Sequence, residues 1–159
     1  MPSPQQVSSS LRMGEMDVAC VDGKLRTLLG SCVGLALYDR RQRIGGLAHI
    51  VLPEARGKSQ RPGKYVDTAI PLLVSQMRDV AESDLRLSAK IAGGASMFAT
   101  SEAGNIGQQN VAACEDALKA LRIPIVARHC GGEQGRRMTL EIANGNVVIE
   151  IVGEDRIDL

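Results

Sequence analysis

Two residue types in this chain are suited to nucleophilic catalysis, a thiol and an imidazole, and one such pair lies on neighbouring apolar segments. Cys32 immediately precedes an apolar run at residues 33–38, and His49 lies within a second apolar run at residues 44–52. The polar stretch 39–43 between the runs predicts a β-hairpin. A hairpin brings residues that are distant in sequence next to each other, so the two side chains are candidates for joint chemistry.

The expected register of this hairpin places the thiol beside the imidazole. A turn centred between Arg40 and Arg41 pairs Cys32 directly with His49. Directly opposed residues of an antiparallel pair share a face, with Cβ atoms roughly 4.5–5.5 Å apart. A slip of one residue would put the two side chains on opposite faces.

An adjacent imidazole can activate a cysteine. A free thiol has a pKa of about 8.5 and is mostly protonated near neutrality, and an imidazole that takes the proton stabilises the thiolate as an ion pair. Gly30 and Ser31 would leave an open approach to the sulfur, and the N–H of Cys32 is a candidate donor to an oxyanion. The alternative interpretation is that Cys32 is a small buried hydrophobe and His49 a polar residue of the core.

The remaining cysteines and the second histidine form no comparable arrangement. Cys20, Cys114 and Cys130 show no CxxC spacing, which favours free thiols and gives no metal-site motif. His129 and Cys130 are adjacent, and neighbours on a strand point to opposite sides.

Periodicity predicts about seven strands and two helices. The strands are expected at residues 25–30, 33–38, 44–52, 87–92, 123–128, 138–143 and 146–152. Asp67 is expected to cap a helix whose buried face is Ile70, Leu73, Met77 and Val80, and Asn110 a helix whose buried face is Val111, Cys114, Leu118 and Leu121. These elements predict an α/β (α+β) sandwich with mixed, largely antiparallel sheets and two main helices. Residues 1–14 are expected to form a flexible tail, and residues 15–159 a single domain.

Composition narrows the function classes. The chain has 159 residues, a net charge of +1 and only 2% aromatic residues, which argues against a nucleic-acid-binding module. There is no apolar stretch of roughly 20 residues and no secretory signal pattern, so we expect a cytoplasmic protein without direct membrane insertion.

Five sequence motifs carry a family resemblance. They are Thr27-Leu28-Leu29-Gly30-Ser31-Cys32-Val33, Gly45-Gly46-Leu47-Ala48-His49-Ile50-Val51-Leu52-Pro53, Gly63-Lys64-Tyr65-Val66-Asp67-Thr68-Ala69, Lys90-Ile91-Ala92-Gly93-Gly94-Ala95-Ser96-Met97-Phe98 and Asn105-Ile106-Gly107-Gln108-Gln109-Asn110-Val111. In order and spacing they closely resemble the bacterial chemoreceptor glutamine deamidases, the CheD family. The resemblance runs from about residue 16 to residue 152.

The resemblance implies a catalytic cysteine at Cys32, a catalytic histidine at His49 and a threonine on the strand that leads into Gly-Ser-Cys. The family usually has this threonine at the position of Arg26. Either a local bulge lets Thr27 take the role, or the third role is weaker or is filled by another residue. The implied reaction hydrolyses the amide of receptor glutamines through a thioester, without a metal or an organic cofactor, and receptor helices are the implied substrate.

Further roles are expected for the small residues near the cysteine. Gly30 and Ser31, together with Gly93 and Gly94, are candidates for binding the substrate, although Gly93-Gly94 could equally be a tight strand exit. Phe98 is a candidate contact for a CheC-type phosphatase, which the resemblance implies as a possible partner. The alternatives are a cysteine peptidase or broader amidase, and a non-catalytic adaptor that binds such a phosphatase.

Overall fold

The computed structural model describes residues 8–57, 61–96 and 106–159, which form ten strands and two α-helices. The strands are β1 (Ser8–Leu11), β2 (Met16–Cys20), β3 (Lys24–Leu29), β4 (Val33–Asp39), β5 (Ile44–Ile50), β6 (Leu87–Gly93), β7 (Ile125–Cys130), β8 (Arg136–Glu141), β9 (Val147–Glu150) and β10 (Ile157–Asp158). The helices are α1 (Val66–Val80) and α2 (Ile106–Ala120), and a short 3₁₀ helix at Pro62–Lys64 precedes α1.

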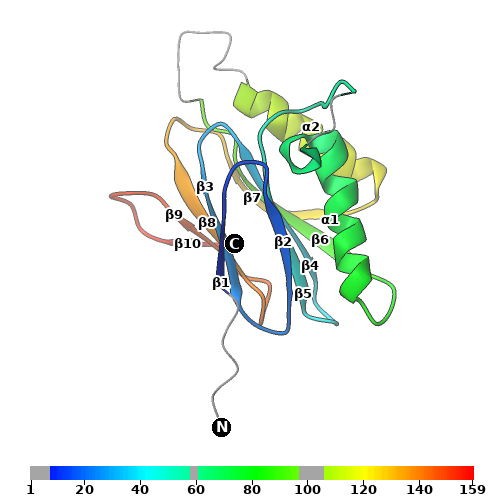
Figure 1. Cartoon of the computed structure of the whole chain (residues 1–159). Coiled ribbons are helices and arrows are strands. Elements are labelled where there is room, and N and C mark those ends of the chain that lie inside the picture. Colours follow the sequence, from blue (N-terminus) through cyan, green and yellow to red (C-terminus); the bar gives the residue numbers. More distant parts are fainter. Residues whose placement is uncertain (1–7, 58–60, 97–105) are drawn as a thin grey trace.

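The strands form two five-stranded sheets packed face to face. Sheet A has the order β1-β3-β8-β9-β10, and sheet B has the order β2-β5-β4-β6-β7. Only the pairs β1–β3 and β6–β7 are parallel among these described strands. Both helices cover the face of sheet B that points away from sheet A (Figure 1). This arrangement confirms the α+β sandwich of mixed, largely antiparallel sheets with two main helices.

The central strands of sheet B, which lies between sheet A and the helices, are buried on both faces. Along β4, Leu35 and Leu37 pack toward the helices, whereas Ala36 packs toward sheet A, and every residue of the strand is buried. Because side chains alternate along a strand, β4 contributes to two apolar layers, one under the helices and one between the sheets. Burial of each leucine stabilises the folded state by about 1.5–3 kcal/mol. The space between the sheets is apolar, which matters for any polar group placed there.

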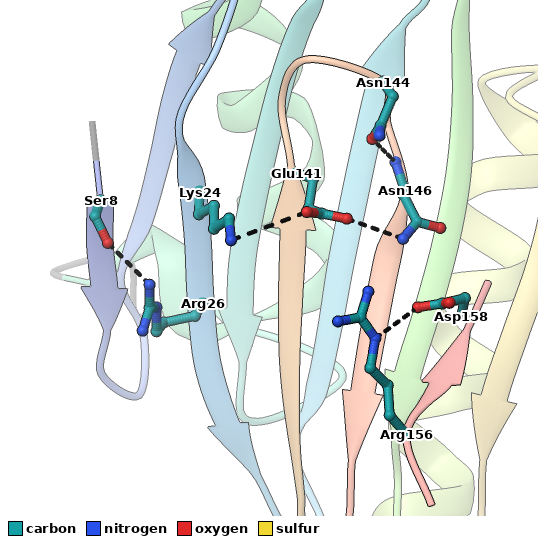
Figure 2. Close-up of polar contacts among 8 residues, drawn as sticks. All are labelled: Ser8, Lys24, Arg26, Glu141, Asn144, Asn146, Arg156 and Asp158. Atoms are coloured by element: carbon teal, nitrogen blue, oxygen red, sulfur yellow. Dashed lines mark hydrogen bonds and ion pairs between the residues drawn. The ribbon is translucent and has the colours of Figure 1, made fainter. Parts of the chain in front are cut away.

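Strand β1 lies in the segment expected to be a flexible tail. Ser8–Leu11 pairs in parallel with β3, and Leu11 is buried in the layer between the sheets. On the outer face of sheet A, Arg26 donates a hydrogen bond to the hydroxyl of Ser8, and Lys24 lies 4.0 Å from Glu141 (Figure 2). The tail expected over residues 1–14 is therefore wrong for Ser8–Leu11, because burial of one leucine and pairing with β3 order this segment.

The expected helix caps are wrong. Tyr65, not Asp67, precedes α1, and the Asp67 carboxylate instead accepts a hydrogen bond from the backbone of Ala55. Helix α2 already begins at Ile106, which places Asn110 in its second turn with no exposed surface. Both side chains are used in tertiary contacts, which local sequence rules do not describe.

The expected buried faces of the helices hold in part: Val111 of α2 is only partly buried, and the last member of each face is exposed. On α1 the first three residues of the face are buried, whereas Val80 is 47% exposed. On α2, Cys114 and Leu118 are buried, but Leu121 is 48% exposed because the helix ends at Ala120. Val80 is the last residue of α1, and Leu121 lies one residue beyond α2, so both are at helix ends that the core does not cover.

The hairpin of β4 and β5 forms, but its register differs from the expected one. Gly34, not Cys32, lies opposite His49. The turn is centred one residue later because β4 continues to Asp39, whose carboxylate accepts a hydrogen bond of 3.0 Å from the N–H of Gln42. This displacement moves the pairing by two positions on one strand, and side chains repeat every two residues. Cys32 and His49 therefore stay on the same side of the sheet as diagonal neighbours.

Candidate active site

Cys32 lies where the chain crosses from sheet A to sheet B. β3 ends at Leu29, β4 begins at Val33, and Gly30, Ser31 and Cys32 form the connection, which we call the crossing turn. The cysteine side chain packs in the apolar layer between the sheets, and the residue is 7% exposed. The open approach expected from the small residues before it is therefore not present, and the thiol lies in a nearly dry environment.

His49, the penultimate residue of β5, is 3% exposed. Its N–H donates to the carbonyl of Glu15, and its carbonyl accepts from the N–H of Gly14, at 3.0 and 2.8 Å. Opposite it, a Cβ at Gly34 would overlap with the side chains of Met138 and Leu29 in sheet A. The glycine allows sheet A to approach closely here, and this approach brings β3 within reach of the imidazole.

The hydroxyl of Thr27 contacts the imidazole of His49. Thr27 Oγ1 lies 2.6 Å from His49 Nδ1 and 2.8 Å from the carbonyl oxygen of Leu11. A carbonyl can only accept, so the single hydroxyl hydrogen is donated to Leu11, and Oγ1 accepts the hydrogen of Nδ1–H. This assignment leaves the lone pair on Nε2, which is the nitrogen free to act as a base.

No bulge is needed to bring Thr27 into this position. The β3–β8 ladder is unbroken from Lys24 to Leu29, and Thr27 is buried between the sheets while Arg26 points to the outer face. The expected bulge is therefore absent, and simple alternation along β3 turns Thr27 inward. Strand β1, which was missed at the sequence level, supplies the Leu11 carbonyl that fixes the hydroxyl.

Burial favours the neutral forms of both candidate catalytic groups. It raises the pKa of the Cys32 thiol and lowers the pKa of the His49 imidazole, because each charged form loses its hydration. His49 Nε2 is buried without a hydrogen-bond partner among the described residues. The thiolate–imidazolium pair expected from the sequence is thus disfavoured at rest. The structure therefore gives a neutral thiol and a neutral imidazole that lie on the same side of sheet B but form no hydrogen bond with each other at rest. Hydrogen bonds of unliganded active sites often tighten only when substrate binds.

The glycine pair at the end of β6 lies against the crossing turn. The N–H of Gly94 donates to the carbonyl of Cys32 at 2.9 Å, and the N–H of Ala95 donates to the carbonyl of Gly30 at 3.0 Å. Gly93 and Gly94 have φ values of +100° and +65°, and a Cβ at Gly93 would overlap with the carbonyl oxygen of Cys32. The two glycines therefore allow the backbone of β6 to support the turn that carries the thiol.

A pocket of about 540 Å³ opens beside the imidazole. Thr27 and His49 line it together with three arginines, Arg12, Arg26 and Arg137. A neighbouring pocket of about 650 Å³ includes Gly30 of the crossing turn. The surface next to the site is therefore hollowed and carries guanidinium groups.

The amino-acid sequence of this chain is similar to that of many named proteins. A family model described as CheD chemotactic sensory transduction matches residues 51–151. A probable chemoreceptor glutamine deamidase CheD from Methanococcus vannielii is 43% identical over 141 residues, covering 87% of this chain and 92% of that protein. Its namesake from Clostridium botulinum strain Alaska E43 is 41% identical over 160 residues, covering 96% and 99%. The chain belongs to the CheD family.

Membership extends across the site itself. The family match begins after His49, but the Clostridium relative covers 96% of the chain and so spans the segment from Cys32 to His49 as well. CheD proteins also occur in the archaeon Methanococcus, so the family is wider than the bacterial one that the sequence resemblance named.

Three further expectations concern Phe98, metal binding and membrane insertion. Phe98, the expected contact for a phosphatase, lies outside the described residues. Among residues 8–57, 61–96 and 106–159, no three His, Cys, Asp or Glu side chains are grouped to hold a metal ion. No helix in these ranges is long and apolar enough to cross a membrane.

Proposed function

We propose that this protein is a chemoreceptor glutamine deamidase, which hydrolyses the side-chain amide of receptor glutamines to glutamate. The observation that carries the proposal is the contact of 2.6 Å between Thr27 Oγ1 and His49 Nδ1, which leaves Nε2 as a base on the side of the sheet that holds Cys32. The names of the CheD relatives support the same substrate.

The first half of the reaction forms a thioester. As the sulfur of Cys32 attacks the carboxamide carbon, Nε2 of His49 takes the thiol proton, and the carbonyl oxygen becomes an oxyanion. The N–H of Cys32 stabilises this oxyanion. The tetrahedral intermediate then loses its C–N bond, and the nitrogen leaves as ammonia with the proton from Nε2.

The second half regenerates the thiol. Nε2 takes a proton from water, the resulting hydroxide attacks the thioester carbon, and the C–S bond breaks as the sulfur regains its proton. The product is glutamate. Throughout, Nδ1–H remains bonded to Thr27, which keeps the ring in one orientation.

The arginine-lined pocket is the proposed docking place for the receptor segment around the glutamine. The guanidinium groups of Arg12, Arg26 and Arg137 suit a segment with carboxylates near the reacting side chain. Because Cys32 is 7% exposed, the glutamine side chain must enter end-on.

The test uses a purified receptor cytoplasmic fragment incubated with the full chain. We expect ammonia release and conversion of glutamine to glutamate in peptide mass spectra, with an intact backbone, and loss of both signals in Cys32→Ala. Backbone cleavage would support the peptidase alternative. Binding without any chemical change would support the adaptor alternative, which the burial of Cys32 favours.

The proposed setting is the cytoplasm, where the receptor helices are exposed. A CheC-type phosphatase is a proposed partner, with Phe98 as its contact. Co-purification of the full chain with such a phosphatase, compared between the natural sequence and Phe98→Ala, tests this contact. Equal retention of the phosphatase by both chains would refute the role of Phe98.

A further inference from the structure

One buried amide links the two backbone segments that carry the candidate catalytic residues. Asn110 lies in the second turn of α2 and is 0% exposed. Its Nδ2 donates to the carbonyl of Ser31 at 3.2 Å and to the carbonyl of Val51 at 2.9 Å. Ser31 immediately precedes Cys32, and Val51 follows His49 by two residues. A single side chain thus holds the crossing turn and the end of β5 in one arrangement.

The bond to Ser31 controls the direction of the N–H of Cys32. A trans peptide is planar, so the carbonyl of one residue and the N–H of the next point in opposite directions. The carbonyl of Ser31 and the N–H of Cys32 belong to the same peptide. Fixing that carbonyl toward α2 therefore points the N–H of Cys32 away from α2.

The neighbouring peptides are fixed in the same way. The carbonyls of Gly30 and Cys32 accept hydrogen bonds from the N–H groups of Ala95 and Gly94 just after β6, at 3.0 and 2.9 Å. All three carbonyls of the crossing turn are therefore bonded to the scaffold. The bond from Asn110 is the only one of the three made by a side chain, so it can be changed by mutation without changing the backbone.

The side-chain oxygen of Asn110, Oδ1, is buried and makes no compensating hydrogen bond with any of the described residues. Such a group destabilises the folded state. Asn110 also lies one and two turns before Cys114 and Leu118 on the buried face of α2, where an apolar side chain would pack. The position keeps an amide at a cost in stability, as is common for groups that serve a site.

We propose that Asn110 is a positioning residue, whose amide orients the Ser31–Cys32 peptide so that the N–H of Cys32 stabilises the oxyanion formed during acyl transfer to the thiol. The same amide fixes the crossing turn against the end of β5, and thereby the thiol against His49. The inference rests on the proposed function for its natural substrate, but the acyl transfer itself can be measured with an activated ester.

The experiment compares two reactions of the same thiol. p-Nitrophenyl acetate acylates a cysteine through an oxyanion and releases nitrophenolate, whereas iodoacetamide alkylates it by displacing iodide without an oxyanion. We would measure both rates for Asn110→Asp, which keeps the shape but loses the donors, and for Asn110→Ala. Leu118→Ala is the matched control, since it also truncates the buried face of α2 but belongs to the core between helices and sheet B, not to the layer that holds Cys32.

The expected result is a selective loss. In both Asn110 variants, the acylation rate falls at least about tenfold, in line with the loss of an oxyanion donor. The alkylation rate changes by less than about threefold. In Leu118→Ala the ratio of the acylation rate to the alkylation rate stays unchanged. With the receptor fragment, kcat falls and KM is nearly unchanged. Circular dichroism selects the folded variants, and Asn110→Ala carries the test if the aspartate variant does not fold.

Two results would overturn the proposal. Equal losses of acylation and alkylation would mean that Asn110 only holds the thiol in place, and unchanged acylation would mean that it does not orient the N–H. Failure of the deamidase function has a different signature, because the natural chain would then react with the ester but release no ammonia from the receptor fragment.

Discussion

Two regions of this molecule hold a cysteine and a histidine close together, and they differ in what their nitrogen and sulfur atoms are free to do. In the first, Cys32 of the crossing turn and His49 of β5 lie on one side of sheet B. In the second, His129 and Cys130 are neighbours at the end of β7. Adjacent residues of a strand point to opposite sides, so the second pair is separated by the sheet.

The hydrogen bonds of the second pair also differ. His129 Nδ1 lies 2.8 Å from Nη1 of Arg136, and a guanidinium can only donate, so Nδ1 is the acceptor. Cys130 Sγ contacts the carbonyl of Ile91 at 3.7 Å. His49, by contrast, gives its Nδ1–H to Thr27 and keeps Nε2 unpartnered within the described part of the chain. The comparison teaches that an acceptor at Nδ1 leaves the lone pair on Nε2 free to take a proton, whereas a cationic donor at Nδ1 occupies the lone pair of that nitrogen.

The largest expected difference between the regions is the effect of removing each sulfur. Cys32→Ala should lower ammonia release from a receptor fragment by at least about a thousandfold, because the nucleophile is lost. Cys130→Ala should retain activity within about twofold, since its thiol serves packing. Equal activity of the two variants would contradict the assignment of Cys32.

The next largest difference between the two regions is expected from removing each histidine. His49→Ala should lower kcat by about 10²- to 10⁴-fold at neutral pH and slow alkylation of Cys32 by iodoacetamide, because the thiol loses its base. His129→Ala should leave the alkylation rate of Cys32 unchanged. If alkylation in His49→Ala keeps the rate of the natural chain, the imidazole does not activate the sulfur.

A smaller effect is expected at the threonine that orients the ring. Thr27→Val keeps the shape of the side chain but removes the acceptor of Nδ1–H, and should lower kcat by about 10- to 100-fold, as for other groups that orient a functional histidine. Thr27→Ser keeps the hydroxyl and should recover most of the rate. A serine variant as slow as the valine variant would mean that the methyl group, not the hydroxyl, matters.

The smallest effect is a pH dependence. Burial lowers the pKa of His49, so the acid limb of kcat/KM should have its midpoint below the ordinary imidazole value of 6.5. Burial raises the pKa of Cys32, so its alkylation should still increase well above the ordinary thiol value of about 8.5. Rate profiles from pH 5 to 10 measure both, and an acid limb centred above 6.5 would refute the neutral resting pair.

The same shift implies a small change in stability. Just below pH 6.5 the unfolded chain binds a proton at His49 that the folded chain does not, so the free energy of unfolding should rise with pH in this window. Urea unfolding at pH 5.5 and 6.5 should show a smaller difference in His49→Gln than in the natural chain. An identical difference would place the titration elsewhere.

Part of the site could be predicted from the local pattern of apolar and polar residues. The apolar runs around residues 39–43 predicted the hairpin of β4 and β5, and with it the shared side of Cys32 and His49. The exact register was wrong because Asp39 extends β4 and accepts a hydrogen bond from Gln42. Face assignment survived this error because side chains alternate every two residues, and the error was two.

Other parts of the site depend on contacts that no local pattern describes. The Leu11 carbonyl belongs to a strand that is ordered by pairing with β3, and it lies 16 residues from Thr27 in sequence. Asn110 was expected as a helix cap, yet its partners Ser31 and Val51 lie 79 and 59 residues away. One signal for it was available, namely a polar residue in phase with the buried Cys114 and Leu118.

The amino-acid sequence alone determined the strands that carry Thr27 and His49 and those that flank Cys32, since alternation and turn-forming residues act over a few neighbouring positions. The family resemblance assigned their roles. Only the tertiary structure decided which nitrogen of His49 keeps a free lone pair, because that depends on a hydroxyl in one sheet, an imidazole in the other and a carbonyl in a third strand. Their distances are set by how closely the two sheets pack, and Gly34 permits that approach.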